Sequence, residues 1–117
     1  MDVSGAAVGL PVSDLQRSVE WYQRVLELAE PDLEPVEGVV EFRVGPIWLQ
    51  LGKDSTVRSG AEVVTRFGVA DASRERERLE ALGVAVGPLE HVPGAVDYFD
   101  FSDPDGNTLS MYSEVEQ

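Results

Sequence analysis

The stretch Asp103-Pro104-Asp105-Gly106-Asn107 separates two segments with the composition of β-strands, Tyr98–Phe101 and Leu109–Tyr112. Proline presets φ, glycine accepts a positive φ, and aspartate and asparagine side chains bond to nearby backbone groups. Each of these residue types therefore favours a tight reversal of the chain. The C-terminal part of the sequence is predicted to be a β-hairpin.

The residues before this hairpin predict a strand and then a helix. Glu62–Val69 is a β-compatible run, and Asp71 is suited to cap a helix over Ser73–Leu82. Gly83 follows, at a place where a helix C-terminus favours glycine. Three strands are expected to complete this half of the chain, at Val84–Leu89, Val96–Phe101 and Thr108–Tyr112.

The first half of the chain has the same order of elements. Ala6–Val12 is an apolar run suited to a strand, and Ser13 followed by Gln16 has the form of a helix capping box. The helix is predicted to end near Leu28, with a buried stripe of Leu15, Val19, Tyr22, Val25 and Leu26. Three strands are expected next, at Leu33–Val36, Val39–Val44 and Ile47–Leu51, the last two joined at Gly45-Pro46.

The two halves form a tandem repeat. A shift of the sequence superposes Val12-Ser13-Asp14 on Val69-Ala70-Asp71, which is the junction of strand and helix in each half. The sequence therefore predicts an α+β fold made of two modules, each with a strand, a helix and three further strands. The first module is expected at about residues 1–57 and the second at about 58–117.

In these motifs the chain resembles the vicinal oxygen chelate superfamily. The resemblance rests on Leu10-Pro11-Val12-Ser13-Asp14-Leu15, Trp21-Tyr22, the restart at Val69-Ala70-Asp71 and the turn that begins at Asp103. This superfamily includes glyoxalase I, extradiol dioxygenases, fosfomycin-resistance enzymes and bleomycin-resistance proteins. The resemblance implies tandem βαβββ modules in a curled mixed sheet around a cavity, with the helices outside, and a homodimer.

The composition bounds the possible functions. The 117 residues include no cysteine and one histidine, which excludes disulfides, Cys-type zinc sites and any site that needs two imidazoles from one chain. The net charge of −13 makes nucleic acid and membranes poor partners. It favours a cationic ligand, or it simply keeps the protein soluble. The N-terminal residues lack a signal-peptide pattern, so a cytoplasmic location is expected.

Strand alternation predicts which side chains face the cavity that the resemblance implies. Successive side chains of a strand point to opposite faces, and the apolar set of each strand should meet the helices. The opposite set is the predicted ligand-binding lining: Glu41, Arg43, Trp48, Gln50, Arg66, Tyr98, Asp100, Ser110 and Tyr112. Two readings stay open for Asp100 and Glu41, as an acid or base, or as carboxylates neutralised by Arg43 or Arg66. Trp48 could instead pack at a dimer interface.

Metal-dependent relatives carry His, Gln or Glu at one inward position of the first and last strand of each module. The resemblance places these positions at Ala7, Gln50, Val64 and Ser110, of which only Gln50 offers a strong ligand. No metal and no cofactor are therefore expected. His91 is the one residue that could restore a metal site or act as a general base, and otherwise it is a surface residue.

These observations favour a metal-free small-molecule-binding protein of the bleomycin-resistance type, which sequesters a cationic antibiotic or natural product. The alternative is a glyoxalase-like lyase or isomerase with an atypical site, whose catalytic residues the sequence leaves unknown. A purely structural or regulatory domain is a third possibility. The acidic residues Glu27, Glu30, Asp32, Glu34 and Glu37 could attract a cation, or they form a solvated loop.

Overall fold

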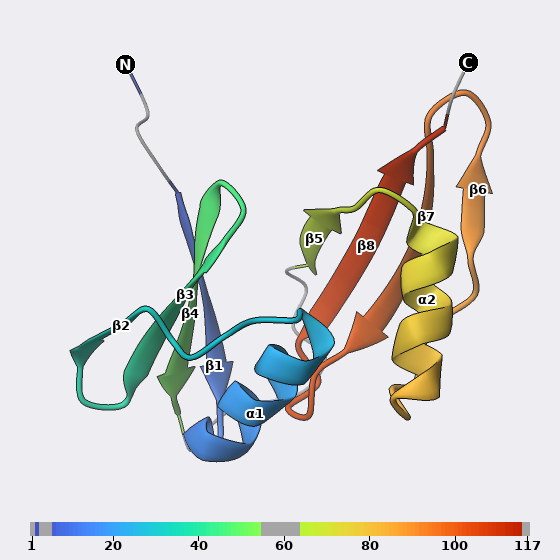
Figure 1. The fold of residues 1–117 in the computed structure, drawn as a ribbon. Helices are drawn as coiled ribbons and strands as arrows, with labels where there is room; N and C mark the ends of the chain where they lie inside the picture. The colour runs from blue at the N-terminus through green and yellow to red at the C-terminus, as the bar shows by residue number, and fades with distance from the viewer. Residues whose placement is uncertain (1, 3–5, 55–63, 116–117) are drawn as a thin grey trace. The chain divides into compact units, whose positions relative to one another are not determined.

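The structure is a computed structural model that describes residue 2 and residues 6–54 and 64–115 (Figure 1). It divides into two compact units, Met1–Arg58 and Ser59–Gln117. Each unit has the element order βαβββ, so the predicted α+β class with tandem modules is confirmed. Within the described residues, no helix is long and apolar enough to cross a membrane.

Each unit contains one four-stranded mixed sheet and one helix (Figure 1). The first sheet has the order β1-β4-β3-β2, and the second has the order β5-β8-β7-β6. In both sheets the first strand of the unit pairs parallel with the last, and the remaining pairs are antiparallel. The first unit comprises β1 (Ala7–Val12), α1 (Leu15–Val25), β2 (Leu33–Val36), β3 (Val39–Val44) and β4 (Ile47–Lys53). The second comprises β5 (Val64–Gly68), α2 (Ala72–Ala81), β6 (Glu90–Val92), β7 (Val96–Ser102) and β8 (Thr108–Glu114).

The first helix begins one residue later than the capping-box pattern predicts. Asp14 is the N-cap, and its carboxylate accepts a hydrogen bond from the Arg17 backbone N–H at 3.0 Å. The Ser13 hydroxyl instead accepts from the Arg17 guanidinium. A carboxylate satisfies an unpaired N–H and also interacts favourably with the positive end of the helix, which explains why Asp14 takes the cap. The helix ends at Val25, before Glu27 takes a φ of 55°.

The second helix has the predicted N-cap and terminal glycine, and its bounds, Ala72–Ala81, lie one residue earlier than predicted at both ends. The Asp71 carboxylate accepts from the Arg74 backbone N–H at 3.1 Å, and Gly83 follows the helix with a φ of 86°. Glycine carries no steric penalty in this left-handed conformation.

The strand predicted at Val84–Leu89 is wrong. Val86 forms only an isolated bridge to Phe101, and the edge strand lies further on, at β6. The Gly87 N–H still bonds to the Asp100 carbonyl at 2.8 Å, but Pro88 has no N–H with which to extend the ladder. The start of the strand predicted at Glu62–Val69 lies outside the described residues, which have β5 from Val64.

The alternation of buried and exposed side chains in the strands follows the prediction. One face of each sheet supplies the core: Leu10, Val12, Val40, Phe42, Leu49 and Leu51 in the first unit, and Thr65, Phe67, Phe99, Phe101, Leu109 and Met111 in the second. Helix α1 contacts β4, and α2 contacts β7 and β8. The opposite face of each sheet therefore carries the side chains that do not contribute to the core.

The predicted stripe of α1 is only partly buried. Tyr22 and Val25 have no exposed surface, whereas Leu15, Val19 and Leu26 are half-buried. Ser18 occupies a fully buried position of the helix instead. Positions 18, 22 and 25 define the face that meets the core of this unit.

The turn between β7 and β8 is organised by the side chain of Asp103. This residue is 5% exposed, and its Oδ1 accepts from the backbone N–H groups of Asp105 and Asn107 at 2.9 and 2.8 Å. Its Oδ2 accepts from the Asn107 side-chain amide at 2.7 Å. Gly106 has a φ of 83°, which confirms the predicted use of glycine in the turn. The hairpin thus depends on one buried carboxylate.

Replacing Asp103 should destabilise the protein strongly. Asp103→Ala removes three hydrogen bonds and leaves buried N–H groups unsatisfied, so we expect the free energy of unfolding to fall by about 3 kcal/mol. Urea unfolding followed by circular dichroism measures this change. Pro104→Ala, an exposed substitution in the same turn, is the matched control and should cost less than about 0.5 kcal/mol. A similar loss in the two variants would show that the carboxylate does not organise the turn.

Candidate ligand-binding site

Two tyrosines and an arginine line a pocket on the sheet of the second unit. Tyr98 and Tyr112 are directly opposite each other on β7 and β8, and Arg66 is opposite Ser110 on β5 and β8. Directly opposed residues share a face of the sheet, which here is the face that does not supply the core. An open pocket of about 640 Å³ is lined by Arg66, Val96, Tyr98 and Tyr112.

Arg66 connects most of the polar groups of this face. Its Nη1 donates a hydrogen bond to the Ser110 hydroxyl at 3.1 Å and lies 3.8 Å from Oδ1 of Asp100. The guanidinium carbon is 5.8 Å from the centroid of the Tyr98 ring, within the range of a cation–π contact. The reading of Asp100 as a carboxylate that neutralises Arg66 therefore agrees with the structure. The side chains of Arg66 and Asp100 are 51% and 50% exposed, so the pair is solvated and weak.

Ser110 lies beneath the pocket surface. It has no exposed area, and its hydroxyl donates to the Phe99 carbonyl at 3.1 Å while it accepts from Arg66. The hydroxyl proton is thus committed to the Phe99 carbonyl, and one of the two lone pairs of the oxygen accepts from Arg66. Ser110 positions Arg66 rather than offering an atom to a ligand.

Gly68 allows the Tyr112 ring to lie over β5. These two residues are directly opposite each other, and a Cβ built on Gly68 would lie 3.0 Å from the Tyr112 hydroxyl oxygen and 3.1 Å from Cζ. Such distances are shorter than ordinary van der Waals contact, so any larger residue would displace the ring. Neither Gly68 nor Val96 was predicted to belong to the site. The alternation of side chains through Tyr98 places Val96 on the same face and could have identified it.

The predicted lining residues of the first unit form separate, smaller features. The Arg43 guanidinium lies 5.4 Å from the centroid of the Trp48 ring and donates through Nε to the Gly45 carbonyl at 2.8 Å. Gln50 is directly opposite both Gly9 and Glu41, and it lines a hollow of about 260 Å³. The structure thus brings Arg43 to Trp48, and the hollow beside Gln50 has no aromatic ring in its lining.

His91 does not contribute to the pocket of the second unit. Its Nδ1 bonds to the carboxylate of Asp97, its direct partner across β6 and β7. The next residues along these strands, Glu90 and Tyr98, are also paired, and they point to the other face of the sheet because side chains alternate. The histidine is exposed on the face opposite to Tyr98.

Comparison with known proteins identifies the family. The model of the Glyoxalase/Bleomycin resistance protein/Dioxygenase superfamily matches residues 6–111. The chain belongs to this superfamily.

Solved structures of superfamily proteins have the same fold. The fosfomycin resistance protein FosX from Listeria monocytogenes superposes with a TM-score of 0.83 at 19% identity, over 98% of this chain and 96% of that one. Lactoylglutathione lyase from Agrobacterium tumefaciens gives 0.76 at 22% identity, over 92% and 91%. A glyoxalase/bleomycin resistance protein from Catenulispora acidiphila gives 0.75 at 19% identity, over 97% and 100%. No curated protein sequence matches the chain. At these identities the likeness establishes the fold alone.

The residues at the metal-ligand positions implied by the superfamily resemblance do not suit a metal. Ala7 and Val64 carry no donor atom, and the buried Ser110 hydroxyl is bonded to the Arg66 guanidinium and the Phe99 carbonyl. Gln50 is the one strong donor of the four. Within the described residues, no three His, Cys, Asp or Glu side chains gather in a way that could hold an ion.

A substitution at Gly68 tests whether this residue positions Tyr112. In Gly68→Ala the new methyl group should push the ring away from β5, and the ring signals of Tyr112 should shift in NMR spectra of ¹³C-tyrosine-labelled protein. Gly9→Ala is the matched control, because its Cβ would meet Gln50 at an ordinary 3.6 Å. If the Tyr112 signals stay in place in Gly68→Ala, the glycine does not position the ring.

Proposed function

We propose that this protein binds a small, planar, aromatic molecule in the pocket of the second unit, without a metal ion. The proposal rests on the pairing of Tyr98 and Tyr112 across β7 and β8, with Arg66 beside them. These side chains line an open pocket of about 640 Å³. Volumes of roughly 300–1,000 Å³ are usual for small-molecule sites. Aromatic side chains bind planar ligands by stacking or edge contact, which requires no catalytic group.

The charges around the pocket support a cationic ligand. Glu90 is directly opposite Tyr98, and Glu114 is directly opposite Val96, so both carboxylates share the face of the pocket. With Asp100 they give three carboxylates against the single guanidinium of Arg66, which Asp100 already neutralises in part. The net charge of −13 adds a favourable long-range field for a cation. We therefore propose that the ligand is a cationic antibiotic or natural product, which the protein sequesters.

The metal-free part of the proposal rests on the chemistry of the donor set. Ser110 holds Arg66 in place, at the position where the resemblance implies a ligand to the ion. The same hydrogen bond places the cationic guanidinium beside the hydroxyl, and its charge would repel a metal ion there. The resemblance also implies a homodimer. Analytical ultracentrifugation would measure the oligomeric state.

The aromatic pocket can be tested with 9-aminoacridine, a planar aromatic cation. Its affinity, measured by fluorescence titration, should fall about tenfold in Tyr98→Leu because a stacking partner is lost. Trp48→Leu, which removes an aromatic ring from the first unit, is the matched control and should bind as the unchanged protein does. Neutral acridine should bind more weakly than its cationic analogue. A loss of affinity in Trp48→Leu alone would contradict the assignment to the second unit.

The metal-free character can be tested on the purified protein. Titration with Mn²⁺, Ni²⁺ or Zn²⁺ should leave the melting temperature unchanged, because a ligand raises it only when it binds the folded state. Elemental analysis after dialysis should find no stoichiometric metal. One equivalent of a divalent ion that survives dialysis would overturn this part of the proposal.

A further inference from the structure

The Arg66 side chain crosses a whole strand of the second sheet. It starts on β5, whereas Tyr98 and Asp100 are on β7, and β8 lies between these two strands. Neighbouring strands are about 4.8 Å apart, so β5 and β7 are separated by roughly 10 Å. The guanidinium nevertheless lies 5.8 Å from the centroid of the Tyr98 ring and 3.8 Å from the Asp100 carboxylate. Ser110, directly opposite both Arg66 and Asp100, is small enough to leave room for this crossing.

The guanidinium of Arg66 is held at one nitrogen and open at the other two. Its Nη1 donates to the buried Ser110 hydroxyl at 3.1 Å, and 3.8 Å to Asp100 is too long for a hydrogen bond. Among the described residues, no acceptor binds Nε or Nη2 of this side chain. A guanidinium is a rigid planar fork, so holding Nη1 also orients the N–H groups on the other nitrogens. Arg66 lines the pocket and its side chain is 51% exposed, so these N–H groups are available to a ligand.

The two ends of the pocket carry opposite charges. Ser110, Tyr112 and Glu114 alternate along β8 and therefore share its outer face. Arg66 is directly opposite Ser110, and Val96 is directly opposite Glu114. Four residues of a strand extend about 13 Å, a length that a planar molecule of two or three fused rings bridges. The pocket thus has N–H donors at one end, aromatic rings in the middle and a carboxylate at the other end.

From this arrangement we infer that the ligand is a planar aromatic cation with a neutral carbonyl-type acceptor at the end opposite its positive charge. The inference rests on the proposed function and adds the polarity of the ligand to it. The carbonyl oxygen accepts from Arg66, the rings lie against Tyr98 and Tyr112, and the positive charge is directed to Glu114. The guanidinium repels a cationic group, which determines the orientation. A hydrogen bond from a charged donor is stronger than one between neutral groups.

The charge of the protein favours a neutral acceptor over a carboxylate at Arg66. Asp100 already offsets part of the guanidinium charge, and Glu90 and Glu114 share this face of the sheet. The net charge of −13 adds a long-range repulsion of anions. A carbonyl oxygen receives the same N–H groups and meets none of this repulsion.

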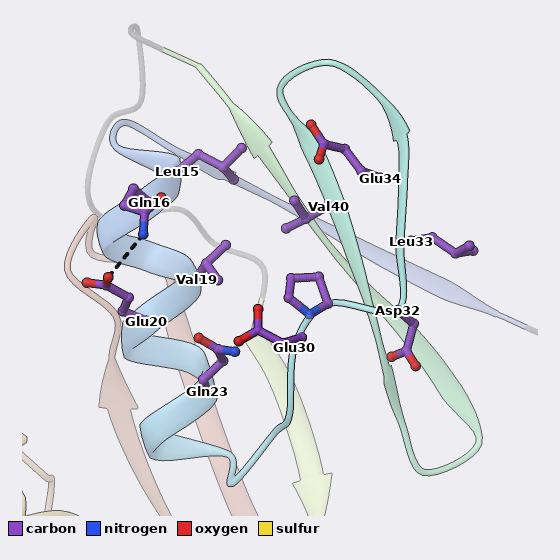
Figure 2. Close-up of a pocket in the computed structure, with 11 residues that line it drawn as sticks. Leu15, Gln16, Val19, Glu20, Gln23, Glu30, Asp32, Leu33, Glu34 and Val40 are labelled. Atoms are coloured by element: carbon purple, nitrogen blue, oxygen red, sulfur yellow. Dashed lines mark hydrogen bonds between the residues drawn. The ribbon is translucent and has the colours of Figure 1, made fainter.

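Two features of the first unit lack this combination. Arg43 lies beside Trp48, but its Nε already donates to the Gly45 carbonyl at 2.8 Å, and neither side chain lines the hollow beside Gln50. The concavity beside α1, drawn in Figure 2, is lined by neither an aromatic nor a basic side chain. The inference therefore concerns the pocket at Arg66.

A pair of probes isolates the contribution of the acceptor. 2-Naphthamidine has planar rings and a positive charge, and 6-carbamoyl-2-naphthamidine adds a neutral carbonyl at the opposite end. We expect the carbamoyl compound to bind about tenfold more tightly in fluorescence titrations, as one hydrogen bond from a charged donor would give. The 6-carboxylate analogue should bind less tightly than the carbamoyl compound, because carboxylates surround the pocket.

Substitution of Arg66 tests the donor. Arg66→Met removes a positive charge and should raise the affinity of both cations, so the informative quantity is the ratio of the two affinities. This ratio should fall from about ten to about one. Arg74→Met, at an exposed position of α2, changes the net charge equally and should keep the ratio. Ser110→Ala removes the hydrogen bond that positions Arg66 and should give an intermediate ratio of about three.

Several results would overturn the inference. These are no binding of either naphthamidine, equal affinities of the two compounds for the unchanged protein, tighter binding of the carboxylate analogue, or an unchanged ratio in Arg66→Met. The 9-aminoacridine titration uses a ligand without the acceptor, so it tests the proposed function separately.

Discussion

In each four-stranded sheet, alternate side chains of every strand must point to the same face. The apolar set of the strands is sequestered on one face with the helix, as Phe42, Leu49 and Leu51 show in the first unit and Phe99, Phe101 and Leu109 in the second. This burial supplies most of the driving force for folding. It also determines which side chains a ligand could reach, because a residue that does not join the core is presented on the other face. Arg66, Tyr98 and Tyr112 share a pocket because their neighbours in sequence are buried.

The two units use the same architecture for different surfaces. The second unit has paired tyrosines, with Gly68 leaving room for the Tyr112 ring and Ser110 holding Arg66 from below. The first unit places Arg43 beside the Trp48 ring and has a smaller hollow beside Gln50. A larger concavity of the first unit, about 720 Å³, lies beside α1. The two units thus share one scaffold and differ in their exposed residues.

The hydrogen bonds of Ser110 connect the fold to the proposed chemistry. Superfamily membership alone leaves binding and catalysis open, because one fold supports many functions. In this chain the Ser110 hydroxyl bridges the Phe99 carbonyl and the Arg66 guanidinium. It therefore holds Arg66 beside the pocket in which we propose that a ligand binds. Ala7 and Val64 offer only hydrocarbon at two other positions. The residues therefore favour recognition of a ligand by shape, aromatic contact and charge.

Local chemistry explains which features were predictable from the sequence. Asp71, Gly83 and the turn from Asp103 to Asn107 act through neighbours a few residues away, so their patterns predicted the helix ends and the hairpin. The alternation of side chains in single strands likewise predicted that Tyr98 and Tyr112 lie on the face of the sheet that points away from the core. The competition between Ser13 and Asp14 for the helix cap could not be decided in this way, because both are good caps and only the three-dimensional path of the backbone chooses. The edge strand at Glu90–Val92 was missed because its pairing with Val96–Tyr98 is a property of the sheet.

The sequence by itself determined the order of elements, the buried face of each strand and the small number of residues that could bind a metal. These features follow from residue type and spacing. The tertiary structure alone decided which exposed residues meet. Arg66 and Ser110 are 44 residues apart and become neighbours only through the parallel pairing of β5 with β8. Leu15 on α1 and Val40 on β3 come to line one concavity because the chain turns back after the helix. Contacts between distant residues depend on strand order and register, and these are set by the packing of the whole sheet.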